Sequence, residues 1–436
     1  MSFYRKTRRL INLLYIDCYS HIIDKEKNNW PLYQKRQLFK LLCYVKVHSS
    51  FFRGKLPDNI SIDNCISVLK SLPVINKKTI NELGYSYYSD EITKEWSNWS
   101  NTGGSTGEPF RFPRLTKGKA ESICQRHLYK TMGSKGSLCD TIVSIDGTRV
   151  DEFKRNNHVF WNESDYSFPY GKFCLSTIYM DPSMLPYYVQ FLNTVKPTIM
   201  RGYPSGFCEL AHYIEDNNIT LSFQVKGIYL TSEGFDKKIE SLIGRIFKCS
   251  VYGQYGHTEA SIFAIKYPEQ NEYYVSPLYG FTEVLNDNDQ QVEVGEMGRI
   301  VVTGFTQYGT PFIRYDTGDL AEYGGVNEYG EVVLSKLLGR SVDYVVNGHG
   351  EKIYLIGFIF GGHLKAFNYI NKWQLEQDKQ GLVRMRIVKG KGYCEEIEKE
   401  IVTLFGTKDL SVDIDYVETI QRTNRGKEKF IIQHLV

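Results

Sequence analysis

The sequence lacks several features that would assign it to a class at once. None of its nine cysteines forms a Cys-x-x-Cys pair, and no Gly-x-x-x-x-Gly-Lys-Ser/Thr phosphate-binding loop occurs. Charge of one sign is also missing: the formal net charge is only +3, which argues against a nucleic-acid partner held by bulk charge. An odd number of scattered cysteines without ligand spacing argues against a cysteine metal site and indicates reduced thiols in the cytoplasm.

Long hydrophobic runs are absent as well. A membrane-spanning helix needs about 20 mostly apolar residues, but the apolar N-terminal stretch Leu10–Ile23 is broken by Asp17, Ser20 and His21. The sequence also shows no secretory signal with a small-residue cleavage site. We therefore expect no transmembrane segment, and an amphipathic surface helix in this stretch; weak contact with a membrane surface stays open as an alternative.

The middle of the chain alternates between two kinds of apolar pattern. Thr141–Ile145 and Val225–Leu230 are short β-branched runs, which predict strands. Between them, one helix face is predicted from apolar residues at helical spacing: Phe207, Leu210, Ala211 and Ile214. Such alternation predicts an α/β fold with a mostly parallel sheet covered by helices. Ligands of such sheets bind at the loops beyond the carboxyl ends of the strands.

Two changes of pattern divide the chain. At roughly 100–200 residues per domain, 436 residues suggest two or three units. From Tyr279 onward, short strands and turns indicate a hairpin-rich β subdomain. After Leu338 a compact α+β unit of ordinary domain size begins. We therefore predict a large domain over residues 1–338 and a small, mobile domain over residues 339–436.

Five polar motifs stand out along the chain. They are the Gly/Ser/Thr-rich Asn101–Pro109, then Tyr255–Glu259, Arg314–Asp319, Gly339–Asp343 and Arg422–Lys427. Glycines let backbone N–H groups approach phosphate oxygens, and carboxylates can bind Mg²⁺ or a ribose diol. Taken singly, each motif also has an ordinary explanation. The first is equally well a flexible linker, the others are polar turns, and the final lysine is a solvated side chain.

In their order and spacing, however, the five motifs resemble those of the adenylate-forming superfamily. This superfamily includes acyl-CoA synthetases, luciferase and nonribosomal adenylation domains. The match extends over about residues 95–436 and points to the phenylacetate–CoA ligase branch, particularly the CapK-like proteins of surface-polysaccharide clusters. Arg201–Ser205, Pro311–Asp319 and the Arg-Thr-x-Arg-Gly-Lys ending are features of that subgroup. Five motifs in register are far more specific than any one of them.

The resemblance implies a role for each matching residue. Phosphate contacts would come from Thr102, Gly104, Ser105, Thr106 and Gly107. Ser232, Glu233 and Gly234 would line the adenine pocket, with Tyr255 against the ring, and Asp319 and Arg340 would bind the ribose. Gly256 and Thr258 would complete the nucleotide site. The catalytic roles would fall to Glu259, as the Mg²⁺ ligand, and to Lys427. This lysine would reach the substrate carboxylate and the α-phosphate during adenylation.

Three positions depart from the family pattern. Gly103 replaces a hydroxyl residue of the loop, and Phe110 stands where many members carry a lysine. Val342, followed by Asp343, takes the place of the acidic hinge residue. The departures imply fewer phosphate donors in the loop and a hinge that differs or rotates less.

The resemblance implies an AMP-forming ligase that uses ATP and Mg²⁺ to activate a small carboxylic acid. One hypothesis is an amide-forming ligase whose acceptor is the amine of an amino sugar or a precursor in capsular polysaccharide biosynthesis. The alternative is a CoA ligase with a thiol acceptor, and a third is a non-catalytic nucleotide-binding protein. The intact set of Glu259, Asp319 and Lys427 speaks against the third hypothesis. The sequence does not separate the first two.

Overall fold

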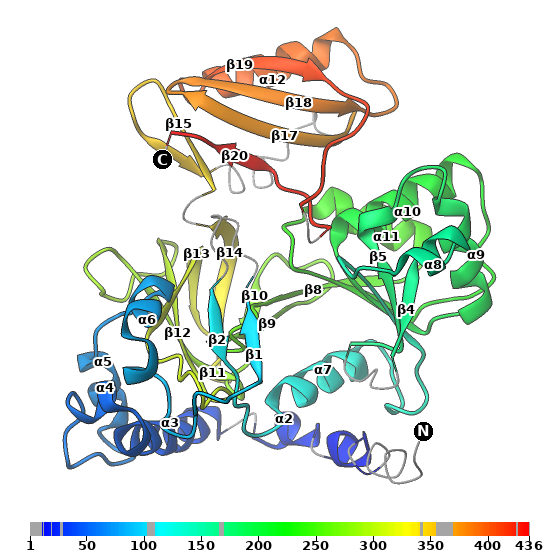
Figure 1. The fold of residues 1–436 in the computed structure, drawn as a ribbon. Coiled ribbons are helices and arrows are strands. Elements are labelled where there is room, and N and C mark those ends of the chain that lie inside the picture. The colour runs from blue at the N-terminus through cyan, green and yellow to red at the C-terminus, as the bar shows by residue number, and fades with distance from the viewer. Residues whose placement is uncertain are drawn as a thin grey trace.

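The computed structural model describes residues 11, 13–18, 20–26, 29–102, 110–164, 170–340, 343–354, 369–423 and 426–435. These residues form a large body built on one long sheet, and a smaller C-terminal body with its own sheet, which lies above it in Figure 1. None of the described helices is both long enough and apolar enough to cross a membrane.

Helices dominate the described part of the first hundred residues. They are α2 (His21–Glu26), α3 (Trp30–His48), α4 (Ser50–Arg53), α5 (Cys65–Ser71), α6 (Lys77–Leu83) and the 3-10 turn η2 (Gly84–Ser86). Helix α3 buries Leu38, Leu41, Leu42 and Val45, whose i, i+3, i+4, i+7 spacing places them on one face. This face packs into the core of the β-rich half of the molecule.

A single mixed sheet forms the centre of the large body. Its strands are β3 (Ile142–Asp146), β4 (Trp161–Glu163), β5 (Phe173–Ser176), β6 (Ile199–Gly202), β7 (Gly227–Thr231), β8 (Ser250–Gly256), β9 (Phe263–Lys266), β10 (Tyr273–Val275), β11 (Gly280–Leu285), β12 (Met297–Gly304), β13 (Tyr315–Val326) and β14 (Val332–Arg340). In space they follow the order β11-β12-β13-β14-β10-β9-β8-β7-β6-β3-β5-β4. Parallel pairing joins β5, β3, β6, β7 and β8, whereas the remaining neighbours are antiparallel.

Helices cover the parallel half of the sheet. They are α7 (Ala120–Thr131), α8 (Glu152–Asn156), α9 (Leu185–Val195), α10 (Pro204–Asp216) and α11 (Lys237–Phe247), with the 3-10 turn η3 (Thr177–Tyr179) before α9. The four apolar side chains predicted to share one face of this helix are all buried on α10: Phe207, Leu210, Ala211 and Ile214. Helix α11 begins at Asp236, whose carboxylate accepts the N–H of Ile239 at 2.9 Å. The predicted α/β fold class is confirmed, but the large sheet is mixed rather than mostly parallel, and its parallel pairs all lie in this half.

The C-terminal domain, defined here as residues 344–435, has its own core. It contains the hairpin β15 (Tyr344–Val346) and β16 (Lys352–Tyr354), then β17 (Ile370–Lys379), β18 (Leu382–Lys389), α12 (Glu395–Gly406), β19 (Ser411–Tyr416) and β20 (Ile431–Gln433). Its four-stranded sheet has the order β19-β18-β17-β20. Strand β14 of the large sheet extends through Arg340, so the predicted division at residues 338 and 339 falls inside this strand. The boundary between independently folding units stays a prediction.

Candidate functional site

A cleft of about 1510 Å³ lies where the large body faces the C-terminal domain. Its walls come from the ends of β6, β7 and β8, from β13 and β14, and from the segment that precedes β20. All the predicted site residues that the structure describes line it: Thr102, Ser232, Glu233, Gly234, Tyr255, Gly256, Thr258, Glu259, Asp319, Arg340 and Lys427. Their individual roles remain predictions, but the fold brings them to one place.

The glycine-rich run is flanked in the sequence by two short strands. Strands β1 (Trp99–Asn101) and β2 (Arg111–Pro113) pair antiparallel on either side of it, and the N–H of Thr102 donates to the carbonyl of Phe110 at 2.9 Å. The Phe110 side chain is only 1% exposed. The phenylalanine that replaces the family lysine therefore serves as a core anchor of the hairpin. Four of the predicted phosphate-binding residues lie outside the described residues: Gly104, Ser105, Thr106 and Gly107.

The end of β8 carries the predicted metal ligand. Glu259 is 8% exposed, accepts the hydroxyl of Tyr315 at 3.0 Å and lies 3.2 Å from Nδ1 of His257. Burial alone would raise the pKa of Glu259, but the His257 ring, a backbone N–H and the Tyr315 hydroxyl together outweigh it and lower this pKa. A carboxylate that is held ionised, with lone pairs left over beyond these two contacts, fits a hard cation such as Mg²⁺.

Two strands bring the predicted ribose residues together. Asp319 and Arg340 are register partners on β13 and β14, and their side chains approach to 3.5 Å. The hydroxyl of Tyr255 donates to the other carboxylate oxygen of Asp319 at 2.7 Å. Burial raises the pKa of Asp319 while the Arg340 guanidinium opposes the rise. Arg340 and Tyr255 therefore hold the Asp319 carboxylate beside an aromatic ring, an arrangement that suits a ribose and its base.

Lys427 enters the cleft from a tight turn of the C-terminal domain. The N–H of Gly426 donates to the carbonyl of Thr423 at 2.8 Å, with Gly426 at a φ of 70°. The Lys427 ammonium donates to the carbonyl of Ser232 at 3.1 Å and lies 5.3 Å from the ring centroid of Tyr203. The lysine therefore spans the two bodies and reaches the end of β7.

Glu233 has a different environment from the one expected of an adenine contact. Its carboxylate accepts the N–H and the hydroxyl of Ser205, at 3.0 and 3.1 Å, and the N–H of Glu428 at 3.0 Å. Burial raises the pKa of Glu233 to about 7, helped by the carboxylate of Glu428 and opposed by the Ser205 contacts. The side chain thus ties the start of α10 to the C-terminal domain.

An ion-pair cluster between the two bodies escaped the sequence analysis. Glu209 of α10 pairs with Lys372 of β17, and it lies 3.1 Å from Arg422. Glu428 completes the cluster, 3.2 Å from Lys372 and 3.8 Å from Arg422. The charges come from separate segments of the chain, so no local pattern could have grouped them. We call these four residues the docking cluster.

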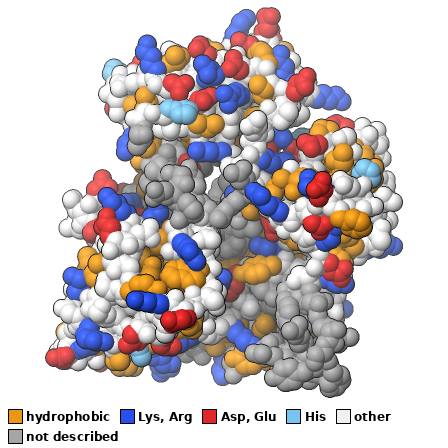
Figure 2. Space-filling view, viewed as in Figure 1, with side chains coloured by type: hydrophobic (Ala, Val, Ile, Leu, Met, Phe, Trp, Pro, Cys, Tyr) orange, Lys and Arg blue, Asp and Glu red, His pale blue; other side chains and the backbone are white. Residues whose placement is uncertain are grey.

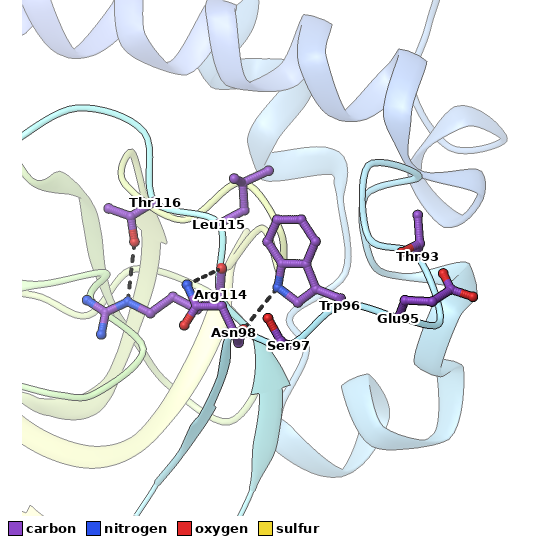
Figure 3. Close-up of a pocket in the computed structure, with 8 residues that line it drawn as sticks. All are labelled: Thr93, Glu95, Trp96, Ser97, Asn98, Arg114, Leu115 and Thr116. Carbon is purple, nitrogen blue, oxygen red and sulfur yellow. Dashed lines mark hydrogen bonds between the residues drawn. The ribbon is translucent and has the colours of Figure 1, made fainter.

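A second, smaller hollow of about 480 Å³ lies beside the β1–β2 hairpin (Figure 3). Its polar groups mostly bond to one another: Trp96 Nε1 donates to the carbonyl of Asn98 at 3.0 Å, and Arg114 Nε to the hydroxyl of Thr116 at 3.3 Å. None of the predicted site residues lines it. The large cleft is therefore the candidate site.

Comparison with known proteins agrees with this fold and these motifs. Residues 349–434 match the CapK C-terminal domain family. Over 425 residues the chain is 24% identical to protein CapK of Staphylococcus aureus, in a match that covers 94% of this chain and 91% of that protein.

Solved structures with a similar fold include a CoA ligase and an acyl acid amido synthetase. The 2-hydroxyisobutyryl-CoA ligase in the postadenylation state with R3-HIB-AMP gives a TM-score of 0.67 at 17% identity, covering 92% of this chain and 89% of that chain. The same ligase in the thioesterification state, with 2-HIB-AMP and CoA, gives 0.53 at 18% identity, with coverage of 94% and 90%. The GH3.15 acyl acid amido synthetase gives 0.58 at 14% identity, with coverage of 92% and 89%. The chain therefore has the adenylate-forming fold with a CapK-type C-terminal domain, and the resemblance that its motifs indicated is confirmed.

Proposed function

We propose that the protein is an AMP-forming ligase that activates a small carboxylic acid with ATP and transfers the acyl group to an amine. The proposed acceptor is the amine of an amino sugar or of a precursor in surface-polysaccharide biosynthesis, by analogy with CapK. One observation carries the proposal: Glu259 follows β8, Asp319 lies on β13 and Lys427 belongs to the C-terminal domain, yet all three line one cleft. The contact of Lys427 with the carbonyl of Ser232, just after β7, differs from the purely solvated position that is usual for a lysine in a surface turn.

In the first step, a carboxylate oxygen of the acid attacks the α-phosphorus of ATP, and the bond to pyrophosphate breaks. Both reactants are anions, so neutralising charge and aligning the reacting atoms must supply most of the acceleration. The ammonium of Lys427 supplies positive charge at this point. Glu259 would hold Mg²⁺, which offsets the negative charge of the phosphates, and Asp319 would hold the ribose with Arg340 beside it.

In the second step, the amine nitrogen attacks the acyl carbon, AMP leaves, and the nitrogen gives up a proton. We assign Lys427 no role in this step, because rotation of the C-terminal domain would withdraw its ammonium from the α-phosphate. The higher TM-score against the postadenylation state than against the thioesterification state supports assigning the present arrangement to the adenylation half of the cycle. Rotation of the C-terminal domain would then open a path for the acceptor.

CoA is the second candidate acceptor. The fold is shared with a CoA ligase as well as with an amido synthetase, so it is compatible with a thiol that attacks the same acyl carbon. The first step is identical for both acceptors. A purified acyl-adenylate offered to CoA and to a panel of amino sugars distinguishes them by the product that forms.

The first test is acid-dependent exchange of labelled pyrophosphate into ATP, in the presence of Mg²⁺. We expect exchange with at least one acid, and a loss on the order of 10²–10³ in rate for Lys427→Ala. Acyl transfer from a preformed adenylate should survive in this variant. Lys391→Ala, at an exposed lysine of the same domain, is the matched control and should exchange normally. No exchange across a broad acid panel, or equal loss of both steps in folded Lys427→Ala, would contradict the proposal.

A further inference from the structure

One wall of the cleft is far more polar than a pocket for an apolar acid requires. It is formed by Glu121 and Gln125 of α7, Arg201 of β6, and the side chains of Tyr170 and Tyr279. In the sheet order, β6 lies two places from β8, so these two strands are about 10 Å apart, and Glu259 lies just after β8. The wall therefore lies beside the predicted nucleotide residues. An acid whose carboxylate is at Lys427 would extend toward it, since Lys427 touches the turn after β6.

The anion on this wall already has hydrogen-bond partners. Glu121 accepts the hydroxyls of Tyr279 and Tyr170, at 2.5 and 3.1 Å, and the amide of Gln125 at 3.3 Å. Gln125 in turn accepts the hydroxyl of Tyr229 at 2.8 Å. Two carboxylate oxygens offer about four lone-pair sites, and three of them are taken by the protein itself. Glu121 therefore organises the wall and leaves little capacity for a substrate.

The cation on this wall, Arg201, has fewer polar partners than Glu121. The Arg201 guanidinium lies close to two aromatic rings, 4.9 Å from the centroid of Tyr170 and 5.2 Å from that of Tyr229. Its Nε is buried without a hydrogen-bond partner, and no described carboxylate forms an ion pair with it. Asp146 interacts electrostatically with Arg201 without forming an ion pair, and its carboxylate accepts the N–H of Thr148 and the thiol of Cys174, each at 2.9 Å.

A guanidinium carries five donors in a planar fork that matches a carboxylate or a phosphate. Removing such a charge from water is costly unless an anion compensates it. From this geometry we infer that Arg201 binds a second anionic group at the far end of the substrate, so that the activated acid is a dicarboxylate or a similar acid with a distal anion. The inference rests on the proposed function, since it names the substrate class of the same site.

Matched acids test this inference in the pyrophosphate exchange assay. Glutarate and pentanoate differ only in the distal carboxylate, as do succinate and butyrate. We expect the wild-type protein to prefer the diacid of a pair, and Arg201→Gln to lower kcat/KM for the diacid by about tenfold to a hundredfold. The same variant should leave the monoacid nearly unchanged. Arg201→Lys should recover part of the preference, because it restores the charge without the fork.

Arg245→Gln is the control for a simple loss of positive charge, because Arg245 pairs with Glu215 on the exposed face of α10 and α11. It should change neither acid. Exchange with monoacids in preference to diacids would overturn the inference while leaving the proposed function intact, as would an equal loss for both acids in Arg201→Gln. Absence of exchange with every acid would remove the proposed function and this inference together.

Discussion

The docking cluster makes a sharp prediction about which half of the reaction needs it. Glu209 forms ion pairs with both Lys372 and Arg422, so Glu209→Gln removes two ion pairs while preserving the size of the side chain. Lys427 is in the cleft only while the C-terminal domain holds this position. We therefore expect Glu209→Gln to slow adenylation and to leave acyl transfer from a preformed adenylate intact.

The size of the effect follows from the burial of the cluster. The side chains of Glu209, Lys372 and Arg422 are 17, 21 and 14% exposed. Exposed pairs contribute about 0–1 kcal/mol, and breaking a buried pair costs about 3–5 kcal/mol. For this intermediate burial we take about 2–3 kcal/mol. At 1.4 kcal/mol per factor of ten, docking becomes roughly 30-fold to 150-fold less favourable, which sets the largest expected loss in exchange rate.

Two rates measured on the same preparation decide the matter: pyrophosphate exchange and single-turnover acyl transfer. Glu215→Gln is the matched control, because Glu215 also lies on α10 but pairs with Arg245 of the same body. Circular dichroism and thermal unfolding show whether each variant is folded. If folded Glu209→Gln exchanged pyrophosphate at the wild-type rate, the cluster would not govern docking. Equal losses in both half-reactions would point to a general structural defect instead.

Two further outcomes are expected at the cleft. Asp319→Ala should weaken AMP binding by about tenfold to a hundredfold, because a charge-assisted contact contributes about 1.5–3 kcal/mol. Calorimetric titration measures the affinity for AMP, with Asp287→Ala at an exposed position as the control. Unchanged affinity in Asp319→Ala would remove Asp319 from the ribose role. Glu233 has its pKa raised from 4.5 to about 7, so its contribution to stability is fully present below pH 4.5 and is lost as the pH rises to about 7. The difference in melting temperature between the wild type and Glu233→Gln should therefore change across this window, whereas parallel curves would contradict the pKa.

The elements that sequence predicted well are those whose pattern is local. The predicted strand at Thr141–Ile145 is β3 with a shift of one residue, and the apolar stripe after Pro204 is the buried face of α10. Strand β17 was missed because its inward-facing positions are partly polar. Gln377 of this strand is fully buried and uses its amide to donate to the carbonyl of Val346 at 2.7 Å and to accept the Val346 N–H, also at 2.7 Å. Because a glutamine whose hydrogen bonds are made by the backbone can be buried, this strand lacks the alternation of apolar and polar residues from which a strand is predicted.

The candidate site divides in the same way. Its motifs were visible because each is a short run of letters, and the fold brings their described residues to one cleft. Phe110 was assigned to the phosphate loop by position, yet its side chain packs 5.2 Å from the ring of Phe112 in the core. The docking cluster and the polar wall around Arg201 depend on which strands become neighbours. No sequence pattern fixes that before the sheet order is known.

The Arg201–Ser205 motif acquires a physical meaning from this arrangement. Arg201 ends β6 at the cleft, and the backbone then passes so close to β3 that only glycine fits at the next position, where a Cβ would lie 1.9 Å from a carbonyl oxygen. Tyr203 packs under Lys427, and Ser205 holds Glu233 against the C-terminal domain. The turn between β6 and α10 therefore connects the polar wall around Arg201 to the contacts with the C-terminal domain. The inferred substrate contact at Arg201 and the domain contact at Ser205 therefore lie on one short segment, so a displacement of this turn would move both together.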